Sequence, residues 1–136
     1  MTKIPKYWTK AKRYLSKKDK KMAKLIQIYQ SPSEIVLTSR RDIFFSLCKS
    51  IIGQQISVAA ANSVFLKFKK KCNYKINAKA VSKLTFRQLK SCGLSRQKVL
   101  GIKSLAKQTL DKSFDPKLIS KLSDEDAINY LSNLRQ

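Results

Sequence analysis

The sequence predicts an all-α fold, and three observations lead to that prediction. Apolar residues recur with helical spacing along most of the 136-residue chain. No segment sustains the alternation of apolar and polar residues that a half-buried strand requires. Residues suited to capping helices stand in front of the periodic segments. The hydrophobic content of 43% suffices for a packed core, so we expect one all-α domain over residues 1–136, made of about seven short helices.

The first part of the chain predicts two basic helices. Residues 8–15 carry the apolar positions of the first. Asp19 is placed to cap the second, whose apolar positions in 22–29 are spaced i, i+3, i+4, i+7. Ser31-Pro32-Ser33 is expected to end it, because proline disfavours a helical residue before it. Tyr7 and Trp8 are expected in the core.

The next two helices meet at a polar turn. Asp42 starts the first, and its apolar stripe is Ile43, Phe44, Leu47, Cys48, Ile51 and Ile52. Gly53-Gln54-Gln55 interrupts the apolar run, and Ser57 is a good N-cap for the second helix. The expected buried face of this second helix is Ala61, Val64, Phe65, Phe68 and Cys72. Phe44 and Phe45 are expected to pack in the core.

Two short helical turns follow a polar connection. Asn77 can cap a turn over residues 78–83. Thr85 and Gln88 have the spacing of a capping box, in which each side chain satisfies a backbone N–H of the other. Gly93 then stands where a helix-ending glycine belongs.

Three cap signals divide the rest of the chain. Ser95 starts a longer helix whose apolar positions are Val99, Ile102, Leu105, Ala106 and Leu110. Asp115-Pro116 combines an N-cap with proline at the first helical position. Ser123 and Asp126 start a last helix, with an expected buried stripe of Ile128, Leu131 and Leu134.

The net charge of the chain restricts the classes of molecule that the protein is expected to bind. Lysine and arginine number 30 against 8 acidic residues, a formal net charge of +22. Such a field favours nucleic acid or an anionic membrane surface. No apolar run reaches the roughly 18 residues of a membrane span, and the start of the chain lacks the apolar core of a signal peptide. Without histidine, and with three scattered cysteines, the chain offers almost no zinc ligands. We expect no metal, no cofactor and a cytoplasmic location.

Gln54 and Gln55 form the least ordinary pair in the chain. One interpretation is a solvated helix end. The other is a pair of amides, each both donor and acceptor, held at a helix junction to touch a polar polymer. The residues themselves leave both interpretations open.

Three segments, in order, resemble a known family. They are residues 41–61 with the run Ile52-Gly53-Gln54-Gln55-Ile56-Ser57, then Gly93-Leu94-Ser95-Arg96-Gln97-Lys98, then 122–134. Together they resemble the amino-terminal part of the DNA-3-methyladenine glycosylase II family, within the helix-hairpin-helix DNA glycosylase superfamily. The resemblance implies base-excision repair by hydrolysis of the N-glycosidic bond of alkylated bases such as 3-methyladenine. It implies double-stranded DNA with alkylated bases as partner and a monomer, which would be nucleoid-associated in a bacterium or nuclear in a eukaryote.

The resemblance also implies the site residues. Gln54, Gln55 and Ser57 would line the DNA-facing cleft. Ser95 and Arg96 would lie in a loop on the minor-groove side, with Arg96 near the gap left by a flipped base. Lys98 would contact phosphate.

The chain departs from the family in one respect. The family's hairpin and catalytic aspartate come after the segment that resembles residues 122–134, where this chain reaches Gln136. All eight carboxylates precede that point, and none can be carried over as catalytic. We therefore expect no catalytic residue in this chain, which would be truncated before the hairpin and inactive as written.

Two other functions remain as alternatives. The helices on either side of residues 53–56 could form a helix-turn-helix in a non-enzymatic basic DNA-binding module. Against it, the second helix starts with Val58 followed by three alanines, whereas a recognition helix needs polar base-reading side chains there. A lysine-rich RNA- or ribosome-associated protein would also fit the charge.

Overall fold

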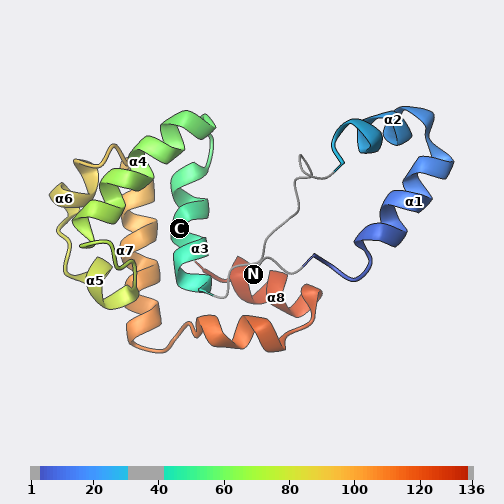
Figure 1. Ribbon diagram of the computed structural model, residues 1–136. Helices are drawn as coiled ribbons and strands as arrows, with labels where there is room; N and C mark the ends of the chain where they lie inside the picture. The colour runs from blue at the N-terminus through green and yellow to red at the C-terminus, as the bar shows by residue number, and fades with distance from the viewer. Residues whose placement is uncertain (1–3, 31–41, 135–136) are drawn as a thin grey trace. The chain divides into compact units, whose positions relative to one another are not determined.

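The structure is a computed structural model that describes residues 4–30 and 42–134, and over these ranges it consists of eight α-helices and one 3-10 helix (Figure 1). The all-α prediction is confirmed. The chain divides into two compact units, Met1–Arg41 and Asp42–Gln136, and each is described by itself. None of the helices in the described ranges is both long and apolar enough to cross a membrane. The predicted helix end at residues 31–33 lies outside these ranges.

The first unit contains two helices that pack on each other, α1 (Trp8–Lys18) and α2 (Lys20–Ile28). Asp19 joins them and caps α2, because its carboxylate accepts hydrogen bonds from the backbone N–H groups of Lys21 at 2.7 Å and Met22 at 3.1 Å. Neither helix has a fully buried residue. Tyr7 is 63% exposed, so its expected place in the core is wrong. Two short helices offer each other too little surface to enclose an aromatic ring.

The second unit holds the core. Its helices are α3 (Ile43–Gly53), α4 (Val58–Lys71), α5 (Ala78–Ser82), α6 (Phe86–Lys90), α7 (Arg96–Leu110), the 3-10 helix η1 (Pro116–Lys121) and α8 (Asp124–Ser132). Helix α7 is central, since it contacts α3, α5 and α6 (Figure 1). Its buried side chains are among those predicted, Val99, Ile102, Leu105 and Ala106.

The three cysteines belong to this core. Cys48 and Cys72 are buried as predicted, and Cys92 is buried as well. Burial raises the pKa of the Cys48 thiol to about 12 and that of Cys72 to about 11. Both thiols therefore stay protonated at neutral pH and act as small apolar side chains.

The phenylalanine predictions on α3 and α4 also hold. Phe44 and Phe68 are buried, and Phe45 and Phe65 pack against the core. The rings of Phe45 and Phe65 meet edge to face with centroids 5.3 Å apart.

In two helices, α7 and α8, the apolar positions predicted from the sequence include residues that are exposed in the structure. Leu110 is exposed, and Ile128 is 63% exposed, so the expected burial of Ile128 is wrong. Leu131 and Leu134 do pack against the core. Leu110 is the last residue of α7, and Ile128 projects from a turn of α8 that no described neighbour covers. Periodicity identifies the apolar side of a helix but not the length of it that meets a partner.

The predicted caps are confirmed. Asp42 accepts from the Phe45 N–H at 2.9 Å, and Asn77 accepts from the Ala80 N–H at 2.8 Å. Thr85 and Gln88 form the predicted capping box. The remaining predicted caps, made by Asp115 with Pro116 and by Ser123 with Asp126, are also present.

Gly93 ends the α6 segment with a φ of +97°, a conformation that side chains with a Cβ rarely adopt. A Cβ at Gly93 would also lie 3.2 Å from Val64 Cγ2. We expect Gly93→Ala to lower the free energy of unfolding by about 1–2 kcal/mol, measured by urea denaturation.

Gly53→Ala is the matched control. A Cβ at this helical position meets the nearest side chain, Ala61 Cβ, at 4.0 Å, which is an ordinary contact. Since alanine restricts the unfolded chain more than glycine does, this change should raise stability by about 0.4–1 kcal/mol. Equal losses for the two variants would contradict the conformational argument.

Candidate functional site

The turn between α3 and α4 contains a strained residue. Gln55 has a φ of +56°, in the left-handed region that glycine and asparagine favour. Holding another residue there costs on the order of 1–3 kcal/mol, and such strain gathers at functional sites. Gln54, the C-cap of α3, precedes it, and Ser57 follows as the N-cap of α4. The turn therefore keeps a glutamine side chain where glycine would be easier to accommodate.

The start of α7 lies opposite this turn. Ser95 is the N-cap of α7, and its hydroxyl accepts from the Lys98 N–H at 3.3 Å. The preceding Leu94 is buried and anchors the connection from Gly93. Ser95 was expected in a loop with Arg96, but Arg96 is instead the first residue of α7.

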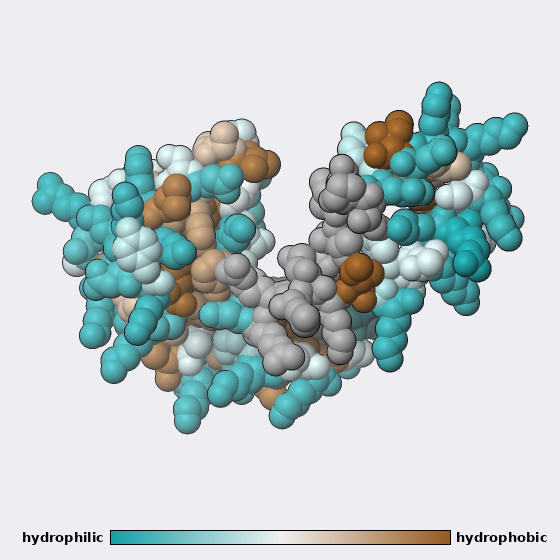
Figure 2. Space-filling view, in the orientation of Figure 1, coloured by the Kyte–Doolittle hydropathy of each residue, from teal (hydrophilic) through white to brown (hydrophobic). Residues whose placement is uncertain are grey.

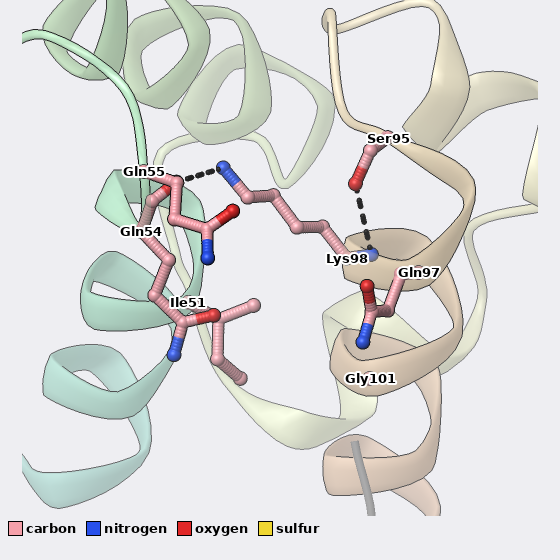
Figure 3. Close-up of a pocket in the computed structure, with 7 residues that line it drawn as sticks. All are labelled: Ile51, Gln54, Gln55, Ser95, Gln97, Lys98 and Gly101. Atoms are coloured by element: carbon pink, nitrogen blue, oxygen red, sulfur yellow. Dashed lines mark hydrogen bonds between the residues drawn. The ribbon is translucent and has the colours of Figure 1, made fainter.

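Lys98 ties the two elements together. Its ammonium donates to the Ile52 carbonyl at 2.9 Å. It also donates to the Gln54 carbonyl at 2.7 Å (Figure 3). Carbonyls at the end of a helix lack partners within the helix, and a cation there is favoured by the helix dipole. The lysine thus holds the end of α3 and the following turn against the first turn of α7. We call this contact the Lys98 tie.

A hollow of about 490 Å³ opens between the turn and α7. Its lining residues are Ile51, Gln54, Gln55, Ser95, Gln97, Lys98 and Gly101. Figure 3 shows the two adjacent glutamines on one wall, Ser95 and Gln97 on the other, and Lys98 reaching across. Three amide side chains thus surround one space, and each can both donate and accept hydrogen bonds.

Four of the six predicted site residues line this hollow: Gln54, Gln55, Ser95 and Lys98. The other two, Ser57 and Arg96, do not. Ser57 caps α4 by accepting from the Ala60 N–H at 3.2 Å, and Arg96 is exposed beside the hollow. The expected contact of Lys98 with phosphate stays a prediction. The structure adds the hydrogen bonds of Lys98 within the protein.

Sequence reasoning missed other residues here. Gln97 and Gly101 line the hollow from α7, and their i, i+4 spacing behind Ser95 was the signal available. At the tip of the turn, Ile56 and Val58 are exposed, although both are apolar. The turn therefore presents apolar side chains beside its amides.

The residues that line the hollow come from a segment of the chain without acidic residues. No aspartate or glutamate stands between Asp42 and Asp111 in the sequence. Asp42 caps α3, while Asp115 caps η1 and Asp126 bonds Ser123, so these carboxylates are engaged at helix starts. No described carboxylate lines the hollow. Within residues 4–30 and 42–134, no cluster of histidine, cysteine or carboxylate could hold a metal ion.

Asp111 has a local role as well. Its carboxylate accepts from both the N–H and the hydroxyl of Ser113, and these hydrogen bonds lower the pKa of Asp111. The result is a charged turn at the end of α7, away from the hollow.

Comparisons with known proteins give consistent results. The HhH-GPD superfamily of base excision DNA repair proteins matches residues 48–134. DNA-3-methyladenine glycosylase 1 of Schizosaccharomyces pombe is 25% identical over 130 residues. That alignment covers 93% of this chain and 57% of the relative, so the chain spans little more than half of the relative's length.

Solved structures share the fold. The S. pombe 3-methyladenine DNA glycosylase, in complex with abasic DNA, matches with a TM-score of 0.77 at 23% identity, over 92% of this chain and 62% of that one. The 3-methyladenine DNA-glycosylase of Archaeoglobus fulgidus gives 0.71 at 22% identity, over 95% and 51%. The DNA-3-methyladenine glycosidase of Bacillus halodurans gives 0.68 at 19% identity, over 89% and 55%.

Proposed function

The chain belongs to the HhH-GPD superfamily of base excision DNA repair proteins, and we propose that it serves in the removal of alkylated bases from DNA by hydrolysis of the N-glycosidic bond. The observation that carries the proposal is the hollow between the α3–α4 turn and α7, with glutamines on both walls. The net charge of +22 suits the phosphate backbone of DNA.

The finer assignment is the DNA-3-methyladenine glycosylase II family, with 3-methyladenine among the bases removed. The similarity to DNA-3-methyladenine glycosylase 1 of S. pombe supports this assignment, and so does the run from Ile52 to Ser57. We propose that the protein is a monomer and that its partner is double-stranded DNA with alkylated bases. We also propose that it is located with the cellular DNA.

The hollow suits recognition of disrupted DNA. A base can be attacked only after it leaves the stack, at a cost of a few kcal/mol that is least at damaged pairs. Gln54, Gln55 and Gln97 can donate to and accept from exposed base edges whichever base is present. Arg96, exposed at the start of α7, would fill the gap left by the flipped base. Ser57 would line the DNA-facing cleft, and Lys98 would contact a phosphate of the DNA.

The chemistry needs a carboxylate to stabilise the developing positive charge on the sugar and to orient water. An alkylated purine already carries positive charge and leaves readily, so strong acid catalysis and metal are unnecessary. Among the described residues, no carboxylate lines the hollow. We therefore propose that the 136-residue chain binds DNA without releasing base.

No observation favours the helix-turn-helix alternative. The exposed start of α4 is Val58, Ala59 and Ala60, which offers a base edge no polar side chain.

The test compares binding of the chain to a duplex with an abasic-site analogue and to the same duplex undamaged. We expect preference for the abasic duplex, and we expect the double variant Gln54→Ala, Gln55→Ala to reduce that preference about tenfold, or about 1.4 kcal/mol. The measurement is fluorescence anisotropy at several salt concentrations, because non-specific affinity falls steeply with salt.

The control removes two glutamines elsewhere. Gln27 and Gln30 are exposed in the first unit, so Gln27→Ala with Gln30→Ala deletes the same groups without touching the hollow. An equal loss of preference in this control, or no loss in the hollow variant, would reject the proposed role of the hollow. Release of 3-methyladenine from alkylated DNA by the 136-residue chain would reject the proposed lack of a catalytic carboxylate.

A further inference from the structure

The end of α4 far from the hollow, with the connection that follows it, carries five lysines and one exposed tyrosine. We call these residues the α4 collar: Lys67, Lys69, Lys70, Lys71, Tyr74 and Lys75. Helix α4 has 14 residues, so the collar lysines of the helix, Lys67 to Lys71, lie about 15–21 Å along it from the α3–α4 turn. In Figure 1 the helix leads from that turn to α5. The collar is thus separate from the residues that line the hollow.

The collar lysines are not needed to cap the helix. The end of α4 is closed by backbone groups, because the N–H of Asn73 donates to the Lys70 carbonyl at 3.0 Å and that of Tyr74 to the Lys69 carbonyl at 2.9 Å. The Cys72 N–H donates to the Phe68 carbonyl at 3.1 Å. The closed end of α4 therefore does not depend on the lysine ammonium groups.

The connection after α4 is strained and displays its tyrosine. Asn73 and Tyr74 both have positive φ, +50° and +62°, although neither is glycine. Tyr74 is 63% exposed, and the Lys69 ammonium lies 6.0 Å from the centroid of its ring. Two consecutive residues in this region cost free energy, and such strain persists where surroundings or function require it. Here it holds the ring and hydroxyl of Tyr74 at the surface, near the Lys69 ammonium.

The segment of the chain that carries the collar contains no acidic residue. No carboxylate occurs between Asp42 and Asp111, and like charges at i, i+4 spacing, such as Lys67 and Lys71, repel each other. Figure 2 shows hydrophilic side chains over much of the visible surface. A bound polyanion would relieve this repulsion and release its own counterions.

We propose that the α4 collar is a second DNA-binding surface, which holds the phosphate backbone of another duplex segment while the hollow faces the damaged site. Lysines are compact cations that contact phosphate without reading sequence, and a tyrosine hydroxyl also donates to phosphate. An anionic membrane fits less well, because an interfacial helix needs a wide apolar face, whereas the exposed large apolar residues of α4 are Val58 and Leu66.

The test is capture of a second duplex. The 136-residue chain is bound to an immobilised duplex with an abasic-site analogue, and a labelled undamaged duplex is then titrated in. We expect capture by the unchanged chain, and at least a fivefold loss of second-duplex affinity in the triple variant Lys67→Gln, Lys70→Gln, Lys71→Gln. The salt slope of log affinity for the second duplex should fall by about 2.7, since each phosphate contact on duplex DNA contributes about 0.9.

A matched control separates the effect of the collar lysines from the effect of the total net charge. Lys17, Lys20 and Lys24 are exposed in the first unit, and changing all three to Gln lowers the net charge equally. Equal loss of capture in this control would overturn the proposal, because the effect would then follow total charge. Capture of phosphatidylserine vesicles in place of the duplex would also overturn it.

This inference rests on the proposed function, which supplies DNA as the partner. The experiment therefore distinguishes failure of the collar proposal from failure of the proposed function. If the chain binds the immobilised duplex but captures no second one, the collar is rejected and the proposed function stands. If the immobilised duplex is not bound at all, the proposed function itself fails.

Discussion

Phe68→Ala is expected to lower the free energy of unfolding of the chain by about 3–5 kcal/mol, the range for deleting a buried aromatic ring. Phe68 is 0% exposed and lies at the centre of the core that joins α4 to its neighbours. Its ring centroid is 6.4 Å from that of Phe65, which also loses packing. Because small domains are stable by about 5–15 kcal/mol in total, urea denaturation should show a large loss.

Leu66→Ala is the control for Phe68→Ala. Leu66 lies two residues away on the same helix but is 58% exposed, so its removal should change stability by no more than about 0.5 kcal/mol. Similar losses for the two variants would show that α4 is not packed on the core as described.

The second large effect is expected from Lys98→Met, which keeps an unbranched apolar side chain and removes the ammonium. The Lys98 tie consists of hydrogen bonds to the Ile52 and Gln54 carbonyls, and a hydrogen bond with a charged partner contributes about 1.5–3 kcal/mol. Without the tie, the turn that holds Gln55 at positive φ is no longer fixed against α7. We expect at least a tenfold loss of preference for abasic over undamaged duplex.

Two roles of Lys98 can be distinguished by salt. If the lysine acts through the tie, its loss lowers the preference and leaves the salt slope of non-specific binding unchanged. If it contacts phosphate directly, the slope falls by about 1 while the preference remains. Lys90→Met removes the same charge from the exposed last turn of α6 and should leave the preference intact. A fall in slope with full preference would reject the positioning role.

The sequence by itself determined the helices and their starts. Caps act between residues two to four apart, so Asp42, Asn77 and the Thr85–Gln88 pair could be recognised without any knowledge of packing. Gly93 was recognisable for the same reason, since the helix-ending conformation is a property of one residue. The buried positions of Cys48 and Phe68 followed from helical spacing.

Only the tertiary structure decided which apolar positions are covered and what the polar ones touch. Ile128 lies on an apolar stripe like the buried residues, but spacing cannot show whether another element reaches it. Lys98 meets carbonyls 44 and 46 residues away, although its side chain could equally have reached a phosphate. The hollow itself depends on how closely α3 approaches α7, and that distance is set by the packing of side chains from distant parts of the chain.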